Sequence, residues 1–296
     1  MSNSTKPVTC FLSFADSRMA AALTRIEEQA KEMKIFDDIR VYNEFNLDES
    51  FRQRWKELMK PGVRGFGYWC WKPYLMSKIL KSLPDGSTLL YCDAGCHLNS
   101  KGRDRLLYYY RELDKDSLGI KAFPAFCSTI STVESRWTKG DVFDYFNCRN
   151  NKSITHSLQL ASGHIFCRKS PVVQKFLEDW YQAWEDDFSL IDDSPSKTPN
   201  LSGFIENRHD QSIFSILYKL RGGISLPDNE TEASDYSRLL EFPFWDLRDK
   251  GSAYKDRSIL ARLQRYLKAK RINTKIKIEV FKEKLSRFSA FRLKRD

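Results

Sequence analysis

Short apolar runs of the kind that form β-strands alternate along this chain with segments of helical periodicity. Residues 8–15 are the first such run, and a helical pattern over residues 19–33 follows it. Residues 38–43 and 87–93 are further strand-like runs, with helical patterns between them. This alternation predicts an α/β fold with a largely parallel sheet and right-handed crossovers. Ligands of such sheets bind at the carboxyl ends of the strands, which makes the residues just after each run candidates for a site.

The remaining segments extend the alternation. The residue patterns predict further strands at 119–123, 158–167 and 224–226, and helices at 48–59, 74–82, 103–113, 138–146, 171–186 and 209–220. The Asp-, Ser- and Pro-rich segment 187–203 has no periodicity and is predicted to be a mobile loop. With 296 residues, the chain is near the upper limit for one hydrophobic core, so we expect one large domain, or one domain with an appendage.

The charge of the chain is concentrated at its C-terminal end. The formal net charge is +10, but residues 251–296 hold 15 Lys or Arg and four acidic residues, which leaves residues 1–250 nearly neutral. The chain is therefore divided into a body, 1–250, and a basic segment, 251–296. Within the latter, apolar residues recur at helical spacing, for example at 259, 263, 266 and 267.

A basic amphipathic helix is typical of proteins that bind an anionic membrane surface, and residues 254–296 are predicted to do so. The alternative is a C-terminal helix that packs on the body with its basic face in water. Nucleic acid is not expected as a partner, because the neutral body offers no matching groove.

Other features indicate a protein of the cytosol. The longest stretch without a charged residue, 153–167, is too short to span a bilayer, which takes roughly 20 apolar residues. The N-terminus lacks the pattern of a secretory signal. The seven cysteines include no CxxC pair, so a zinc knuckle is not indicated, and Cys92 and Cys96 are interpreted as packing residues.

The segment Gly65-Phe-Gly-Tyr-Trp-Cys-Trp-Lys-Pro73 combines groups that suit a charged ligand with a planar part. Its glycines allow the backbone to approach a ligand, and its aromatic residues supply stacking faces. Lys72 can neutralise a diphosphate at the start of the following helix. The alternative is an aromatic corner of the core with a solvated lysine.

Acidic residues end two of the predicted strands. Asp16 follows the first run, and Asp93 ends the buried run Leu89-Leu-Tyr-Cys-Asp93-Ala-Gly95. A carboxylate in that position suits a hard cation or a ribose, although a turn or cap Asp is an equal alternative.

Small and polar residues interrupt the predicted strand 158–167 at Ser162-Gly163-His164. A glycine inside a strand suggests close approach of another group. His164 fits a contact to a sugar hydroxyl and a core histidine equally well.

Taken together, segments 65–73 and 89–95 resemble those of bacterial surface-polysaccharide glycosyltransferases of O-antigen and capsule assembly, including galactofuranosyltransferases. The resemblance covers roughly residues 8–227. It implies a single GT-A-like, Rossmann-like nucleotide-sugar domain with a mixed, mostly parallel sheet. Such enzymes usually carry Asp-x-Asp, whereas Gly95 stands at the third position here.

The resemblance also implies roles for individual residues. It implies a UDP-sugar donor, with galactofuranose as the specific expectation, whose uracil lies near Asp16 and whose diphosphate lies near Lys72 and Asp93. It places a divalent cation, Mn²⁺ or Mg²⁺, on Asp93. The residues expected to hold the rest of the donor are Gly95, Ser162, Gly163, His164 and His209.

The segment Glu206-Asn-Arg-His209-Asp210-Gln resembles one that opens a late helix in these enzymes. Asp210 is the candidate general base for an inverting transfer, and Glu206 is the reserve. Asp is also a common helix cap, which is the simpler explanation of Asp210. His209 is a candidate metal ligand or diphosphate contact. The acceptor is expected to be a lipid-linked glycan at the inner face of the membrane.

Several other enzyme classes lack their motifs. GxxxxGK[ST], GxGxxG, GxSxG and HExxH do not occur, so there is no motif evidence for phosphate-loop kinases, dinucleotide oxidoreductases, serine hydrolases or zincins. The opposing hypothesis is a non-enzymatic protein that binds a membrane or nucleic acid through its basic segment. Stabilisation by UDP would distinguish the two.

Overall fold

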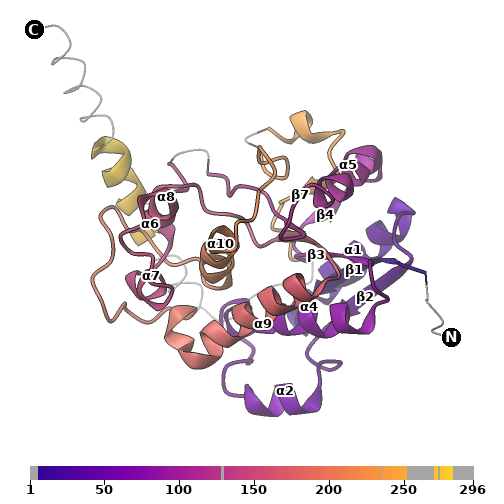
Figure 1. Cartoon of the computed structure of the whole chain (residues 1–296), viewed down its shortest axis with the longest axis horizontal. Coiled ribbons are helices and arrows are strands. Elements are labelled where there is room, and N and C mark those ends of the chain that lie inside the picture. Colours follow the sequence, from indigo (N-terminus) through magenta and orange to yellow (C-terminus); the bar gives the residue numbers. More distant parts are fainter. Residues whose placement is uncertain (1–5, 128–129, 234, 252–269, 273, 283–296) are drawn as a thin grey trace, which may run out of the picture.

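The core of the protein is a five-stranded mixed sheet (Figure 1). The computed structural model describes residues 6–127, 130–233, 235–251, 270–272 and 274–282. The strand order is β2-β1-β3-β6-β5, with the bounds β2 Asp38–Tyr42, β1 Thr9–Phe14, β3 Thr88–Cys92, β6 His164–Arg168 and β5 Ile120–Lys121. β2, β1 and β3 are mutually parallel, and β6 is antiparallel to both of its neighbours. The predicted fold class, α/β with a mixed, mostly parallel, Rossmann-like sheet, is confirmed.

Helices cover both faces of the sheet. The alternation of side chains along β1 sends Cys10, Leu12 and Phe14 into one apolar cluster and Phe11 into another. The first cluster is completed by α4 (Trp71–Ser82), α9 (Pro171–Asp186) and α10 (Asp210–Leu220). The second contains α1 (Ala20–Met33) and α5 (Arg103–Leu113). The result is a three-layer arrangement with the sheet in the middle.

Shorter elements connect these layers. They are α2 (Glu49–Arg54), α3 (Gly65–Tyr68), α6 (Glu134–Trp137), α7 (Gly140–Tyr145) and α8 (Lys152–Thr155), with the 3-10 turns η1 (Ser17–Met19), η2 (Ser100–Gly102), η3 (Phe188–Leu190) and η4 (Tyr236–Leu239). A separate two-stranded ribbon pairs β4 (His97–Leu98) with β7 (Phe244–Trp245).

Several predicted elements differ in the structure. The strand predicted at 158–167 begins only at His164, because Leu158 and Leu160 form isolated bridges to other segments. The helix predicted at 138–146 is shorter in the structure, where α7 covers only Gly140–Tyr145, because Thr138 is extended; the separate short helix α6 ends just before it. Residues 224–226 form no strand. The segment 187–203, predicted to be mobile, contains η3 and is fixed by hydrogen bonds from the Lys197 and Thr198 amides to Asp141.

The reversed direction of β6 decides what lies beside Asp93. Because β6 is antiparallel to β3, its first residue, His164, is opposite Cys92 at the carboxyl end of β3. The Asp93 amide then donates a hydrogen bond to the carbonyl oxygen of Gly163, at 2.9 Å. The small residues before β6 are therefore at the ligand-binding edge of the sheet.

Beyond residue 251, the basic C-terminal segment is described over residues 270–272 and 274–282, which are helical. Ile272, Ile276 and Val280 pack against a small cluster that contains Trp137 of α6 and Ile205. The described part of this helix thus turns apolar side chains towards the body. The apolar positions predicted at 259–267 and at 285–288 lie outside the described residues. Within the described chain, no helix is both long and apolar enough to cross a membrane.

Candidate active site

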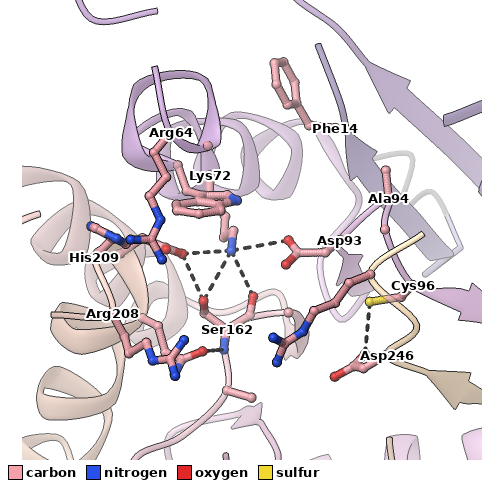
Figure 2. A pocket seen from close by; sticks show the side chains of 18 of the residues that line it. Phe14, Arg64, Lys72, Asp93, Ala94, Cys96, Ser162, Arg208, His209 and Asp246 are labelled. Atoms are coloured by element: carbon pink, nitrogen blue, oxygen red, sulfur yellow. Dashed lines mark hydrogen bonds and ion pairs between the residues drawn. The ribbon is translucent and has the colours of Figure 1, made fainter. Parts of the chain in front are cut away.

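A cavity of about 530 Å³ opens at the carboxyl ends of β1 and β3. The chain leaves β1 towards β2 on one side and reaches β3 on the other, so this is the point where the strand order reverses. Most of the residues predicted to bind a donor line this cavity, together with the predicted base: Asp16, Lys72, Asp93, Gly95, Ser162, Gly163, His209 and Asp210. Sequence positions up to 194 residues apart are thereby brought to one place, as Figure 2 shows for several of them.

Lys72 is at the centre of this group (Figure 2). Its Nζ atom lies 2.8 Å from Oδ2 of Asp210 and 3.4 Å from Oδ1 of Asp93. The same ammonium donates to the carbonyl oxygen of Ser162 at 3.1 Å. Its side chain is 1% exposed, so the sequence-based alternative of a solvated lysine is wrong. Lys72 is buried because it is in the first turn of α4, which packs between the sheet and α9.

The two carboxylates beside Lys72 have different surroundings. Asp210, at the start of α10, is 5% exposed, and Ser162 Oγ donates to it at 2.9 Å. Burial raises the pKa of Asp210, and although Lys72 opposes this, the pKa stays above its ordinary value. Burial lowers the pKa of Lys72, but the charges of Asp210 and Asp93 outweigh burial and raise it overall. Asp93 is 36% exposed to the cavity and accepts a hydrogen bond from the Tyr91 hydroxyl.

Gly163 keeps the carboxylate of Asp93 accessible. A Cβ atom at this position would lie 3.4 Å from Oδ2 of Asp93. Gly163 therefore lies against Asp93, and a sugar at this position stays a prediction.

Two of the predicted site residues do not line this cavity. His164 is fully buried behind Asp93, with its ring against Phe123 and Phe244, so it is not placed to touch a sugar. Its side chain points away because successive strand residues face opposite sides. Glu206 lines a neighbouring cavity instead, and its carboxylate lies 3.6 Å from Arg64 and 3.3 Å from Arg208. Glu206 thus contacts the cavity only through these arginines.

A left-handed turn shapes one wall. Residues 65–69 all have positive φ, between 50° and 92°. This conformation costs about 1–2 kcal/mol for each residue with a side chain. The Tyr68 amide donates to the Arg64 carbonyl at 2.7 Å, and Trp71 Nε1 donates to the Gly65 carbonyl at 3.1 Å. Strain of this kind is characteristic of functional sites. Here it brings Arg64, Trp69 and Lys72 to the same cavity.

One wall of the cavity is aromatic. Phe14, Phe66, Trp69 and Trp71 line the cavity, whereas Tyr68 does not. The rings of Phe14 and Trp71 have their centroids 4.0 Å apart. Asp16, at the same end of β1, is held in an ion pair with Arg18 at 2.6 Å.

Sequence reasoning missed the arginines of the cavity. Arg64, Arg208 and Arg248 all line it, and Figure 2 shows Arg64 and Arg208 on the side of Ser162 and His209. Burial lowers the pKa of Arg208; Glu206 opposes this, whereas the nearby charges of Arg64 and Arg248 lower it further. Three like charges at one cavity indicate a site for an anion. Arg64 directly precedes the segment 65–73, and Arg208 lies within the segment 206–211; their closeness to segments singled out from the sequence was the available signal.

The residues around Asp93 do not by themselves make a site for Mn²⁺ or Mg²⁺. Its Oδ1 already faces Tyr91 and Lys72, and the second carboxylate of the usual motif is replaced by Gly95. In the described part of the chain, no group of three or more metal-ligating side chains includes Asp93. Such ions need several oxygen ligands and no ammonium beside them. A divalent cation on Asp93 therefore stays a prediction, and no step below depends on it.

Comparisons with known proteins give similarities of fold only. No model of a protein family matches the sequence, and no curated protein matches it. Similar solved structures include a glycosyltransferase involved in glycosylation of the major capsid of PBCV-1, at 10% identity and a TM-score of 0.45, covering 81% of this chain and 94% of that one. Another is mouse xyloside xylosyltransferase 1, at 12% identity and 0.43, covering 83% and 96%.

A third similar structure is the galactosyltransferase LgtC in complex with donor and acceptor sugar analogues. It is 14% identical, with a TM-score of 0.41, and the match covers 86% of this chain and 81% of that one. All three TM-scores are below 0.5, so the function of this chain has to be argued from its own cavity.

Proposed function

We propose that this protein is a glycosyltransferase that moves a sugar from a nucleoside-diphosphate donor to a glycan acceptor. The observation that carries the proposal is the meeting of cations and buried carboxylates in one cavity at the carboxyl ends of β1 and β3. Cations suit the diphosphate, and a buried carboxylate suits removal of a proton from an acceptor hydroxyl.

The diphosphate is assigned to the arginine side of the cavity. Arg64 and Arg208 can each present a guanidinium to phosphate oxygens, which matches the bidentate geometry that phosphate prefers. Glu206 lies within 3.6 Å of both guanidinium groups and orients them. The base of the nucleotide is assigned to the aromatic wall near Phe14 and Asp16, with Trp69 as the stacking residue.

The sugar is assigned to the space above Ser162 and Gly163, next to Asp93. In the transfer, the acceptor oxygen forms a bond to the anomeric carbon, and the bond from that carbon to the phosphate oxygen breaks. The electron pair leaves with the diphosphate, whose charge the arginines balance. The acceptor proton passes to the carboxylate of Asp210, because its raised pKa makes it a better base than an ordinary Asp.

Finer assignments rest on the resemblance of segments 65–73 and 89–95. They are a UDP donor, galactofuranose as the sugar, inversion at the anomeric carbon, and a lipid-linked O-antigen or capsule acceptor. Attachment to the inner face of the membrane through residues 254–296 rests instead on the basic, amphipathic composition of that segment. Each of these is part of the proposal.

The test measures donor binding and transfer together. We expect UDP to raise the thermal midpoint of the wild-type protein and a panel of UDP-sugars to show UDP release that depends on a galactoside acceptor. Arg208→Ala should weaken the UDP effect. The matched control is Arg221→Ala, an exposed arginine paired with Asp179, which should leave it unchanged. A wild-type protein that UDP does not stabilise and that releases no UDP would contradict the proposal.

A further inference from the structure

A second group of reactive side chains lies directly behind Asp93. Cys92, Cys96 and His164 each offer one metal-binding atom, and these atoms all lie within 4.8 Å of one another. Their exposed fractions are 0%, 6% and 0%. The transfer reaction proposed above uses none of them.

The backbone brings these residues together from three segments. Cys92 and His164 are opposite each other in the β3–β6 pair. A tight turn, closed by the bond from the Cys96 amide to the Asp93 carbonyl at 2.9 Å, returns Cys96 to the end of β3. The ribbon β4–β7 pairs His97 with Trp245, so the next residue along, Asp246, is level with Cys96.

Asp246 completes the group. Its Oδ1 accepts from Cys96 Sγ at 3.0 Å and lies 3.3 Å from His164 Nε2. Its Oδ2 accepts from the Thr231 hydroxyl at 2.9 Å, which fixes the orientation of the carboxylate. Groups that hydrogen-bond to a metal ligand, as Thr231 does to Asp246, typically hold that ligand in position. Figure 2 shows Cys96 and Asp246 facing each other beside the cavity.

The state of His164 points to a missing ligand. Its ring is fully buried, and neither nitrogen has a hydrogen-bond partner among the residues that the structure describes. Buried polar side chains are normally hydrogen-bonded, so an imidazole in this state requires an explanation. Oδ1 of Asp246 lies 3.3 Å from Nε2 without forming a hydrogen bond, and a metal ion between the two groups would bond to both.

We propose a structural zinc site in this position, whose four ligands are Cys92, Cys96, His164 and Asp246. Two thiolates with an imidazole favour zinc over Mg²⁺ or Mn²⁺, which prefer oxygen ligands. With zinc bonds of about 2.0–2.3 Å, tetrahedral ligand atoms lie roughly 3.3–3.8 Å apart. The ligand atoms of Cys92, Cys96 and His164 need to approach by no more than about 1.5 Å to reach this spacing. Oδ1 of Asp246 already lies 3.0 Å from Cys96 Sγ and 3.3 Å from His164 Nε2. Four protein ligands leave no open position, which is typical of structural sites.

Such a zinc ion joins three parts of the cavity wall. It ties the end of β3, which carries Asp93, to the start of β6, which follows Gly163. It also anchors β7, after which the chain passes Arg248 in the cavity lining. Zinc therefore stabilises the wall without contact to the donor.

The first test measures metal content. Full-length protein without an affinity tag, expressed with added zinc, should contain about one zinc per chain by elemental analysis. Cys96→Ser should lose it, because a hydroxyl is a poor zinc ligand. The control is Cys167→Ser, another fully buried cysteine on β6 that is outside the cluster. It should keep its zinc.

A second measurement does not depend on how the variants fold. Wild-type protein produced with Co²⁺ in place of zinc should show the near-ultraviolet charge-transfer band of a cobalt–thiolate bond and the visible bands of a tetrahedral ion. If wild-type protein produced with Co²⁺ contained no zinc and still lacked this spectrum, the proposal would be overturned. Unchanged zinc content in a folded Cys96→Ser protein, or a Cys92–Cys96 disulfide by mass spectrometry, would overturn it as well.

Discussion

Nζ of Lys72 lies 2.8 Å from Oδ2 of Asp210, and the two side chains are 1% and 5% exposed. A charged pair this deep is held by its own attraction and by few other groups, mainly Ser162 and Asp93. Removal of Lys72 leaves the carboxylate of Asp210 buried without its counter-ion, which is costly, whereas removal of Asp210 leaves Lys72 with Asp93 as its remaining counter-ion. The pair therefore joins α4 to α10 as well as forming part of the proposed active site.

The first prediction concerns the stability that this pair provides. Lys72→Met should lower the free energy of unfolding by about 3–5 kcal/mol, the usual cost of breaking a buried pair. The double variant Lys72→Met/Asp210→Asn should lose less than the single variant, because no uncompensated charge remains. Urea unfolding of both proteins checks this.

The control for this prediction is an exposed pair whose lysine is on the same helix as Lys72, α4, and whose glutamate is on α9. Nζ of Lys81 lies 2.9 Å from Oε1 of Glu178, and the two side chains are 60% and 43% exposed. Lys81→Met should therefore change stability by no more than about 1 kcal/mol. A Lys72→Met protein as stable as Lys81→Met would show that Lys72 is not charged in the folded protein.

The second prediction concerns the base. Asp210→Asn keeps the shape of the side chain and an oxygen for Lys72 but cannot accept the acceptor proton. We expect kcat to fall about 10²- to 10⁴-fold, the range of general base catalysis, with UDP affinity little changed. Steady-state kinetics and calorimetric UDP binding separate the two effects.

Glu206→Gln is the comparison for the base. Because Glu206 contacts Arg64 and Arg208 and lies outside the cavity, its loss should raise the donor KM more than it lowers kcat. If instead Glu206→Gln abolished kcat and Asp210→Asn did not, Glu206 would be the base, and Asp210 would be a helix cap.

The third prediction concerns pH. Burial raises the pKa of Asp210, and a base works only in its deprotonated form. Activity should therefore decline as the pH falls through this raised pKa, at a higher pH than the value of about 3.9 for an ordinary Asp. The pH profile of kcat measures this limb. An acid limb at the ordinary Asp value would argue that the carboxylate is not desolvated in the working enzyme.

The sequence predicted the sheet, and it predicted that a binding site would lie at the carboxyl ends of the strands. Both predictions follow from the alternation of strand-like apolar runs with helical patterns. It assigned Asp93, Lys72 and Asp210 to one site through a resemblance of segments. It could not predict that β6 is antiparallel, since a short strand with an apolar centre has the same pattern in either direction. That reversal is what puts His164 behind Asp93 and out of reach of a sugar.

Other features depended on pairing across long separations. β4 and β7 have two residues each, too few for a period, yet their pairing places Asp246 beside Cys96. Interpreting Cys92 and Cys96 as packing residues was reasonable from their spacing alone, because the third and fourth members of the cluster are far away in the sequence. The left-handed turn at 65–69 likewise could not be predicted, because its only signal in the sequence is the pair Gly65 and Gly67.

The fourth prediction concerns chelation. Lys72 and the arginines supply positive charge to the cavity, so brief exposure to EDTA should leave most of the transfer rate intact. The zinc content of the same sample should be measured, because loss of buried zinc would lower activity for a different reason. A rate that collapses at constant zinc content and returns with Mn²⁺ would instead support a catalytic cation on Asp93.

The last prediction separates packing from membrane binding in the C-terminal helix. Its apolar side chains Ile272 and Ile276 face Trp137 and Ile205, whereas Lys270 and Lys277 are exposed. Ile276→Asp should therefore lower the thermal midpoint. Lys270→Glu/Lys277→Glu should leave the midpoint unchanged but weaken binding to anionic vesicles, since each basic residue contributes roughly 1 kcal/mol at such a surface. Co-sedimentation with anionic and neutral vesicles measures this, and wild-type binding should disappear at 1 M salt, where the Debye length is about 3 Å. Wild-type protein that does not bind anionic vesicles at low salt would leave the helix with a packing role alone.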